Sequence, residues 1–153
     1  IIEGLPPGTR VMVTGVPNDL ESNSEFRELL DLPDVEFNDS VFADLVPLLR
    51  AASLVISVDT ALMHLAVAVG APTLCLASAA FVGEIIPYDP AIAPDNARFI
   101  YHSMPCEGCL GDCIFPPEDG MLPCVAGLEE DAVLGRVQEM LTRDPVLGKD
   151  TAQ

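Results

Sequence analysis

The stretch SLVISVDTALMHLAVAVGAPTLCLAS, residues 53–78, indicates the fold most clearly. Residues 54–58 form a short apolar run rich in β-branched side chains, which is typical of a strand buried on both faces. Apolar side chains then recur at helical spacing over residues 62–69, and the Gly-Ala-Pro turn at 70–72 ends that helix. A second buried strand follows at 72–76, so we predict a strand–helix–strand unit.

Polar side chains stand where the first strand passes into the helix. Asp59 and Thr60 end the strand, and His64 follows within the first helical turns. The short side-chain oxygens of Asp59 and Thr60 can cap the helix. If no ligand binds, His64 would be a hydrogen-bonded polar residue on a helix of small side chains. The other interpretation is a ligand site, because open α/β sheets bind ligands at their carboxyl edge and helix N-termini offer free amides to phosphate.

This stretch resembles the core motif of glycosyltransferase family 9, the lipopolysaccharide heptosyltransferases. That family carries Asp-Ser/Thr-Gly-x-x-His-x-x-Ala-Ala, followed by Pro-Thr and a strand. The matching residues are Asp59, Thr60, His64, Ala68, Pro72 and Thr73. Ala61 replaces the family's glycine, which would let a diphosphate approach the backbone closely. Weaker similarity extends from about Arg10 to the last helix.

The resemblance implies an α/β fold, a Rossmann-like parallel sheet with helices on both faces that forms the C-terminal, donor-binding half of a GT-B fold. The alternation of strands and helices supports the same class.

We expect further strands at 10–16, 34–37 and 98–101, helices at 21–32, 41–51 and 128–143, irregular chain at 17–19 and 79–94, and a frayed tail at 144–153. The residues expected to be buried in the helix at 41–51 are Phe42, Leu45, Leu48 and Leu49. The residues that recur at helical spacing over 62–69 are Leu62, Leu65, Ala66 and Val69. We expect one domain over residues 1–153, with a cysteine-rich loop at 104–126.

The resemblance also implies a function, the transfer of a sugar from a nucleotide-diphosphate donor to a hydroxyl acceptor, with ADP-heptose as a candidate donor. It implies that Thr60, Ala61 and nearby amides meet the diphosphate, and that Asp59 and His64 lie near the transferred sugar. The segment Gly15-Val16-Pro17-Asn18-Asp19 is similar to the family's Gly-x-Pro-x-Glu loop, whose acid is implied to hold the ribose hydroxyls. Asp19 is the best match and Glu21 the alternative, although an acid near a helix N-terminus needs no ligand. No catalytic residue is predicted.

The family's acceptor domain and an upstream strand with a basic phosphate-binding residue have no counterpart in this stretch. We therefore expect the acceptor domain as an N-terminal partner. We also expect these 153 residues alone to be inactive and to bind the donor weakly or not at all. A rival hypothesis is a non-catalytic Rossmann-like module that uses a cysteine metal knuckle for assembly. A nucleotide-sugar epimerase has the same half-fold, but no motif here indicates one.

Four of the five cysteines are concentrated at Cys106, Cys109, Cys113 and Cys124. A Cys-x-x-Cys pair with two further thiols is typical of a tetrahedral structural site for zinc or iron, while disulfides or free thiols are the alternatives. Some relatives of the family are also implied to carry a cysteine-bound iron. His102 could replace one sulfur, and Cys75 is expected to be a buried small hydrophobe.

Composition limits the partners. The 153 residues carry a formal charge of −17 and are half hydrophobic, which favours a folded domain and disfavours nucleic acid or anionic membranes as partners. The same charge is unfavourable for an anionic sugar nucleotide unless a basic partner domain compensates. The apolar run 61–83 is interrupted by His64 and the turn at 70–72, so we predict no membrane span and, without a signal peptide, a cytoplasmic location.

Overall fold

The computed structural model describes residues 1–22, 24–118 and 120–142. The chain divides into two compact units, Ile1–Leu45 and Val46–Gln153, which are described separately below. Both contain parallel strands connected through helices, so the predicted α/β, Rossmann-like fold class is confirmed. The predicted tail at 144–153 lies outside the described residues.

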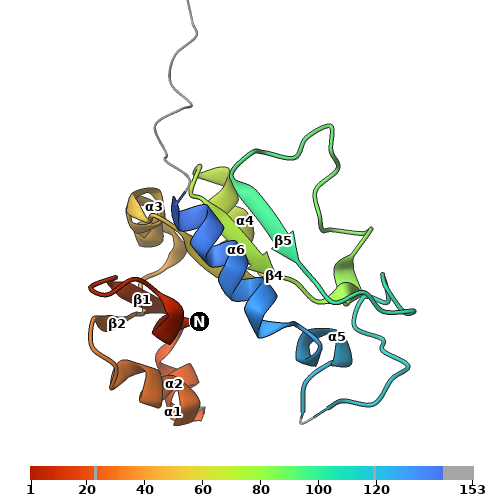
Figure 1. Ribbon diagram of the computed structural model, residues 1–153, viewed down its shortest axis with the longest axis horizontal. Coiled ribbons are helices and arrows are strands. Elements are labelled where there is room, and N and C mark those ends of the chain that lie inside the picture. Colours follow the sequence, from red (N-terminus) through yellow and green to blue (C-terminus); the bar gives the residue numbers. More distant parts are fainter. Residues whose placement is uncertain (23, 119, 143–153) are drawn as a thin grey trace, which may run out of the picture. The chain divides into compact units, whose positions relative to one another are not determined.

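The first unit contains a two-stranded parallel sheet. Its elements are the 3-10 helix η1 (Ile2–Gly4), strand β1 (Val11–Thr14), helices α1 (Pro17–Ser22) and α2 (Ser24–Leu30), strand β2 (Val35–Asn38) and the start of helix α3 (Phe42–Ala51) (Figure 1). Strands β1 and β2 pair in register from Val11 with Val35 to Thr14 with Asn38. The strands predicted at 10–16 and 34–37 are therefore present, with slightly different ends.

The predicted loop at 17–19 is wrong, because helix α1 begins at Pro17. Proline suits the first position of a helix, where its missing N–H would have had no intrahelical partner and its fixed φ is already helical. The predicted helix at 21–32 is also wrong in its ends, since the described helical residues begin at Pro17 with α1 (Pro17–Ser22) and end at Leu30 with α2 (Ser24–Leu30).

The second unit contains a three-stranded parallel sheet in the order β3-β4-β5. Its elements, after the end of α3, are β3 (Val55–Val58), α4 (Ala61–Ala68), β4 (Thr73–Leu76), the 3-10 helix η2 (Ala79–Phe81), β5 (Ala97–Ile100), α5 (Pro123–Ala126) and α6 (Glu130–Thr142). Helix α4 covers one face of this sheet and α6 lies across the other (Figure 1). The predicted strand–helix–strand unit is confirmed, and Gly70 has the left-handed φ of +86° expected after its helix.

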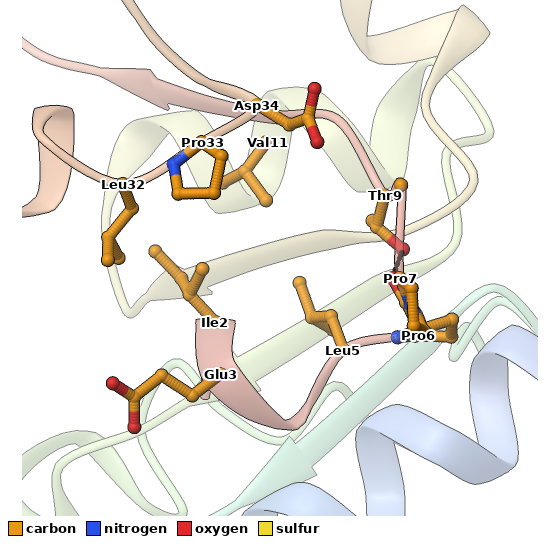
Figure 2. Close-up of a pocket in the computed structure, with 11 residues that line it drawn as sticks. Ile2, Glu3, Leu5, Pro6, Pro7, Thr9, Val11, Leu32, Pro33 and Asp34 are labelled. Carbon is orange, nitrogen blue, oxygen red and sulfur yellow. Dashed lines mark hydrogen bonds between the residues drawn. The ribbon is translucent and has the colours of Figure 1, made fainter.

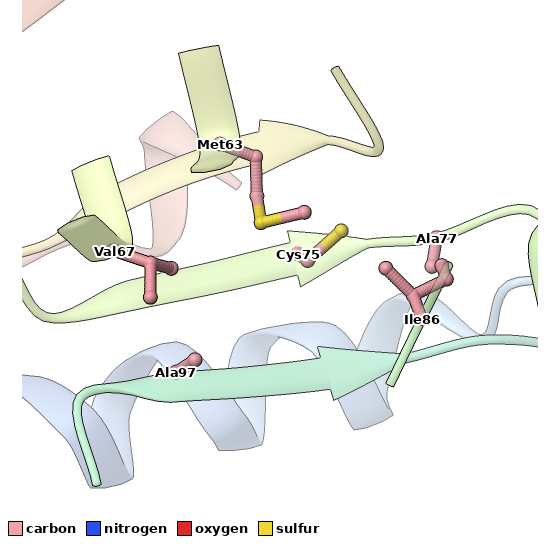
Figure 3. Close-up of a cluster of buried hydrophobic side chains, with 6 residues drawn as sticks. All are labelled: Met63, Val67, Cys75, Ala77, Ile86 and Ala97. Carbon is pink, nitrogen blue, oxygen red and sulfur yellow. The ribbon is translucent and has the colours of Figure 1, made fainter. Parts of the chain in front are cut away.

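The core of the second unit lies between α4, the sheet and the chain that follows η2. The cluster of buried side chains comprises Met63, Val67, Cys75, Ala77, Ile86 and Ala97 (Figure 3). Helix α4 buries Met63, Ala66 and Val67, so of the residues that recur at helical spacing only Ala66 is buried, while Leu62, Leu65 and Val69 are half-buried. Nearly every residue of this helix is apolar, and its spacing therefore could not indicate which side faces the sheet.

Helix α3 buries two of the four side chains expected. Leu45 and Leu49 are buried, whereas Phe42 is 50% exposed and Leu48 is 37% exposed. Leu45 and Leu49 are one helical turn apart and share one side of the helix, while the apolar residues outside that narrow side remain accessible. Among the described residues, no helix is both long and apolar enough to cross a membrane, and the apolar run 61–83 is divided between α4, β4 and η2.

Candidate functional site

Asp59 and Ser78 meet at the carboxyl edge of the three-stranded sheet. Asp59 directly follows β3 and Ser78 lies two residues beyond β4, and these strands pair in register up to Val58 with Leu76. The Ser78 hydroxyl donates a hydrogen bond to Asp59 Oδ2 at 2.9 Å. Ser78 is only 6% exposed, whereas Asp59 is half-buried, so one carboxylate oxygen is held by the protein at an accessible sheet edge.

Thr60 occupies the N-cap position of α4 but does not cap the helix with its side chain. Its backbone is extended, with φ −125° and ψ 170°, and its hydroxyl lies 3.4 Å from the Ser57 hydroxyl. The expected cap by Asp59 or Thr60 is therefore wrong, because Asp59 bonds to Ser78 and Thr60 faces Ser57. The first amides of α4, including that of exposed Ala61, have no partner within the helix and are left for water or a ligand.

His64 contacts a tyrosine that the sequence did not single out. Its Nδ1 lies 2.7 Å from the Tyr88 hydroxyl, and the two rings are tilted by 48° with centroids 5.7 Å apart. Tyr88 lies on the irregular chain between η2 and β5; the irregular chain expected over 79–94 is wrong only at Ala79–Phe81, where η2 forms. A pocket of about 230 Å³ adjoins the pair, and its lining consists of His64, Val67, Ala68, Tyr88, Ile92 and Pro94.

Asp19 belongs to the first unit and lies in the first turn of α1. Its Oδ2 accepts a hydrogen bond from the Val16 amide at 2.9 Å. Gly15 is closely packed there, since a Cβ at this position would lie 2.9 Å from Asp19 Oδ2. The other acid considered for the ribose, Glu21, is exposed near the end of the same helix. These positions follow β1 at its carboxyl end, the side on which ligands bind in such sheets.

The first unit also contains a pocket of about 220 Å³, shown in Figure 2. Its lining comes from the N-terminal segment, from Val11 at the start of β1, and from the Leu32–Asp34 turn that precedes β2. It therefore lies at the amino end of these strands, the opposite end from Asp19. Topology thus separates this pocket from the predicted ribose-binding residue.

Cys75 is buried beneath this sheet edge. Its side chain is fully inaccessible, and burial, together with the charge of Asp59, raises the pKa of its thiol to about 12. A thiol with this pKa stays protonated at neutral pH, so Cys75 is a packing residue rather than a nucleophile. The prediction of a buried small hydrophobe is confirmed.

The cysteine-rich loop places three thiols together. Cys106 lies within hydrogen-bonding reach of Cys113 and Cys109, and partial burial with these neighbours raises the pKa of the Cys106 thiol. Backbone bonds from Gly108 to the Ala79 carbonyl (3.0 Å) and from Leu110 to the Ala80 carbonyl (2.8 Å) anchor this loop to η2.

The fourth thiol of the cluster is on a helix, not on irregular chain as expected. Cys124 is buried in the short helix α5, which also contacts η2. All five cysteines are free thiols. Over the described part of the chain, no group of three or more His, Cys, Asp or Glu residues has the arrangement of a metal site. The thiols of Cys106, Cys109 and Cys113 are neighbours without converging as ligands of one ion, so the four-cysteine metal site stays a prediction.

His102, the other possible ligand, is exposed and packs against Gly127. A Cβ added at Gly127 would lie 2.6 Å from the His102 ring. A glycine at this position therefore leaves space for the imidazole. This contact gives His102 a packing role beside α5, where Gly127 is the C-cap residue.

Ser78 and Tyr88 are the site residues that sequence reasoning missed. Ser78 follows a predicted strand and could have been noticed as a polar residue at the same sheet edge as Asp59. Tyr88 lies 24 positions from His64 on chain without periodicity, and no sequence pattern connects the two.

The second unit is a parallel α/β sheet with an acid and an uncapped helix start at its carboxyl edge, the edge at which open α/β sheets bind ligands. The family model described as glycosyltransferase family 9 (heptosyltransferase) matches residues 8–97, which is more than half of the 153 residues. The chain therefore belongs to glycosyltransferase family 9. The match includes Asp19, Asp59, Thr60 and His64 and ends before the cysteine-rich loop. Neither the search of curated proteins nor the search of solved structures gave a match.

Proposed function

We propose that the chain binds a nucleotide-diphosphate sugar, with ADP-heptose as the candidate donor, for transfer of the sugar to a hydroxyl acceptor. The observation that carries this proposal is the carboxyl edge of β3 and β4, where Ser78 holds Asp59 at 2.9 Å beside the uncapped start of α4. Family membership supports glycosyl transfer as the reaction class. The diphosphate would be the leaving group in such a reaction.

Each group at this edge suits a part of such a donor. Free amides and the dipole of α4 stabilise the negative charge that grows on the departing diphosphate. The Asp59 carboxylate only accepts hydrogen bonds, so with Oδ2 held by Ser78 its other oxygen can accept from a sugar hydroxyl. Asp19 belongs to the first unit and not to this edge, but its carboxylate has the same chemistry for ribose hydroxyls, although its Oδ2 already accepts from the Val16 amide.

Two features predict weak donor binding by these 153 residues. Their formal charge of −17 repels an anionic ligand. Ala61 has a Cβ where the family resemblance implies glycine, which hinders the close approach of a phosphate to the backbone. We propose that an N-terminal acceptor domain completes the enzyme, that this stretch alone is inactive, and that the reaction takes place in the cytoplasm, where a nucleotide-sugar donor would be used.

Titration calorimetry with ADP-glucose, a stand-in for the unidentified nucleotide-diphosphate sugar, tests the proposal. Asp59→Ala should weaken binding about tenfold, a change of about 1.4 kcal/mol. Ala61→Gly should tighten it by admitting the diphosphate. Asp95→Ala is the matched control, because Asp95 precedes β5 and therefore lies at the amino edge of the same sheet. Equal affinity of wild type and Asp59→Ala would remove Asp59 from the site.

The second candidate function is assembly through a metal knuckle in a non-catalytic module. We propose that Cys106, Cys109, Cys113 and Cys124 hold one structural zinc or iron ion. The support is their spacing, the proximity of three of the thiols, and the attachment of both the loop and α5 to η2. Four thiolates would complete a tetrahedral site and leave no position open for substrate.

Elemental analysis of protein purified without added metal tests this second proposal. About one ion per chain is expected, and Cys109→Ser should lose it because a four-coordinate site needs every ligand. Cys75→Ala is the matched control, since it removes the cysteine that lies on β4 outside the cluster. Metal-free protein in which Cys106, Cys109 and Cys113 all react with a thiol reagent would reject the knuckle.

A further inference from the structure

The contact between His64 and Tyr88 joins two parts of the second unit that are distant in sequence. His64 belongs to α4, and Tyr88 to the chain between η2 and β5, with 2.7 Å between Nδ1 and the hydroxyl oxygen. Tyr88 also contacts Phe99 of β5, whose ring meets it edge-on at 89° with centroids 5.4 Å apart. Tyr88 also packs on the buried cluster of α4 and the sheet. The hydroxyl is therefore held against the imidazole by a packed ring.

The tyrosine hydroxyl has one proton and two neighbouring acceptors. One is Nδ1 of His64 at 2.7 Å, and the other is the Met63 sulfur at 3.7 Å. A thioether is a weak acceptor, so the proton belongs on the shorter bond to the imidazole nitrogen. Burial raises the pKa of Tyr88, which keeps this hydroxyl protonated at neutral pH. A neutral imidazole whose Nδ1 accepts carries its own proton on Nε2.

We propose that Tyr88 is a positioning residue that holds His64 with Nε2–H as a hydrogen-bond donor toward an oxygen of the bound ligand. This inference rests on the proposed function, because a nucleotide-diphosphate sugar offers phosphate and hydroxyl oxygens as acceptors. The pocket of about 230 Å³ beside the pair provides space for such a group. His64 and Tyr88 are the polar residues of its lining, and Val67, Ala68, Ile92 and Pro94 are apolar.

Imidazole nitrogen NMR spectra test the orientation without any ligand. The chain has two histidines and two tyrosines, so His102 is an internal reference and Tyr101→Phe is a matched control for Tyr88→Phe. At about pH 8.5, where an ordinary imidazole is neutral, His64 should show an unprotonated Nδ1 whose resonance is displaced from that of exposed His102 by the accepted hydrogen bond. Tyr88→Phe should abolish this displacement, and Tyr101→Phe should leave it unchanged.

A proton on Nδ1 of His64 in the wild-type protein would overturn the proposal, and that spectrum decides even if Tyr88→Phe folds poorly. An unchanged Nδ1 resonance in folded Tyr88→Phe would overturn it as well. Both readouts are independent of ligand binding. The failure of ADP-glucose to bind would therefore contradict the proposed function without affecting the test of the tautomer.

Ligand affinity tests whether the orientation matters for binding. Tyr88→Phe should weaken ADP-glucose binding about three- to tenfold, the range expected for one hydrogen bond between neutral groups. The same substitution in a His64→Ala background should have no further effect, because Tyr88 acts through the imidazole. An equal loss in both backgrounds would show that Tyr88 acts independently of His64 and would overturn its assignment as a positioning residue.

Discussion

The carboxyl edge of β3 and β4 and the cysteine-rich loop, residues 104–126, both gather candidate functional side chains, but by different means. Asp59 and Ser78 meet at 2.9 Å because each follows a strand whose partner is fixed by a parallel hydrogen-bond ladder. The loop depends instead on a few backbone bonds to η2, and its thiols are neighbours without a ligand geometry. A paired sheet therefore positions its edge residues through its own hydrogen-bond ladder, whereas the thiols of the loop are positioned only by a few backbone bonds.

The two regions should differ most in the free energy of unfolding that is lost when a leucine in each is replaced by alanine. Leu74 on β4 is fully buried, and Leu110 on the loop is 58% exposed. Leu74→Ala should lower the free energy of unfolding by about 3 kcal/mol, because it removes buried methyl groups and leaves a cavity. Leu110→Ala should change it by less than about 0.5 kcal/mol. Chemical denaturation measures both, and comparable losses would show that the loop is as tightly packed as the sheet.

Alkaline pH should weaken the sheet through Cys75. Its pKa of about 12 in the folded chain exceeds the ordinary 9.0, so between these values the unfolded chain releases a proton that the folded chain keeps. The contribution of the protonated Cys75 thiol to the free energy of unfolding is fully present below about pH 9. Above this pH the free energy of unfolding should fall by about 1.4 kcal/mol per pH unit.

The measurement is denaturation at several pH values between 8 and 11, comparing wild type with Cys75→Ala. The variant should lose this part of the pH dependence. Leu74→Ala is the control, because it removes no titrating group and should lower stability by the same amount at every pH. Parallel pH profiles for wild type and Cys75→Ala would contradict the assignment of the alkaline loss to this thiol.

The smallest expected effect comes from glycines with left-handed backbones in the two regions. Gly70 has φ +86° in the turn between α4 and β4, and Gly111 has φ +91° in the loop, with open space around both. Gly70→Ala should cost about 1 kcal/mol, because alanine is strained at this φ and the turn is fixed by the elements on both sides. Gly111→Ala should cost less, since irregular chain can relax. Thermal unfolding measures the pair, and a larger loss at Gly111 would reverse the comparison.

The sequence predicted the elements whose positions follow from apolar runs and from residues that end a helix. The apolar run before Asp59, the turn at Gly70 and the second strand are where the pattern places them, and the family motif lies in this unit. The pattern did not identify the buried side of α4, because a helix that is apolar all round has no distinctive face. It also missed the helix that begins at Pro17, since a proline there suits either a loop or a first helical turn.

The candidate site could be predicted only in part, for a related reason. Asp59 and Thr60 stand at a strand end, which a sequence pattern can indicate. The residues that contact Asp59 and His64 are determined by tertiary structure instead. Ser78 comes from the neighbouring strand and Tyr88 from irregular chain, so the contacts that hold Asp59 and His64 appear only once the chain is folded.

The uncapped start of α4 has a consequence for how folding and ligand binding are linked. A side-chain cap at this position would stabilise the helix by about 1 kcal/mol, and Thr60 does not supply one. An anion bound to the first amides would act as an external cap, so the ligand would complete a piece of secondary structure that the chain leaves unfinished. The protein should then melt at a higher temperature as the ligand concentration rises, and the helix would report occupancy of the site through its own stability.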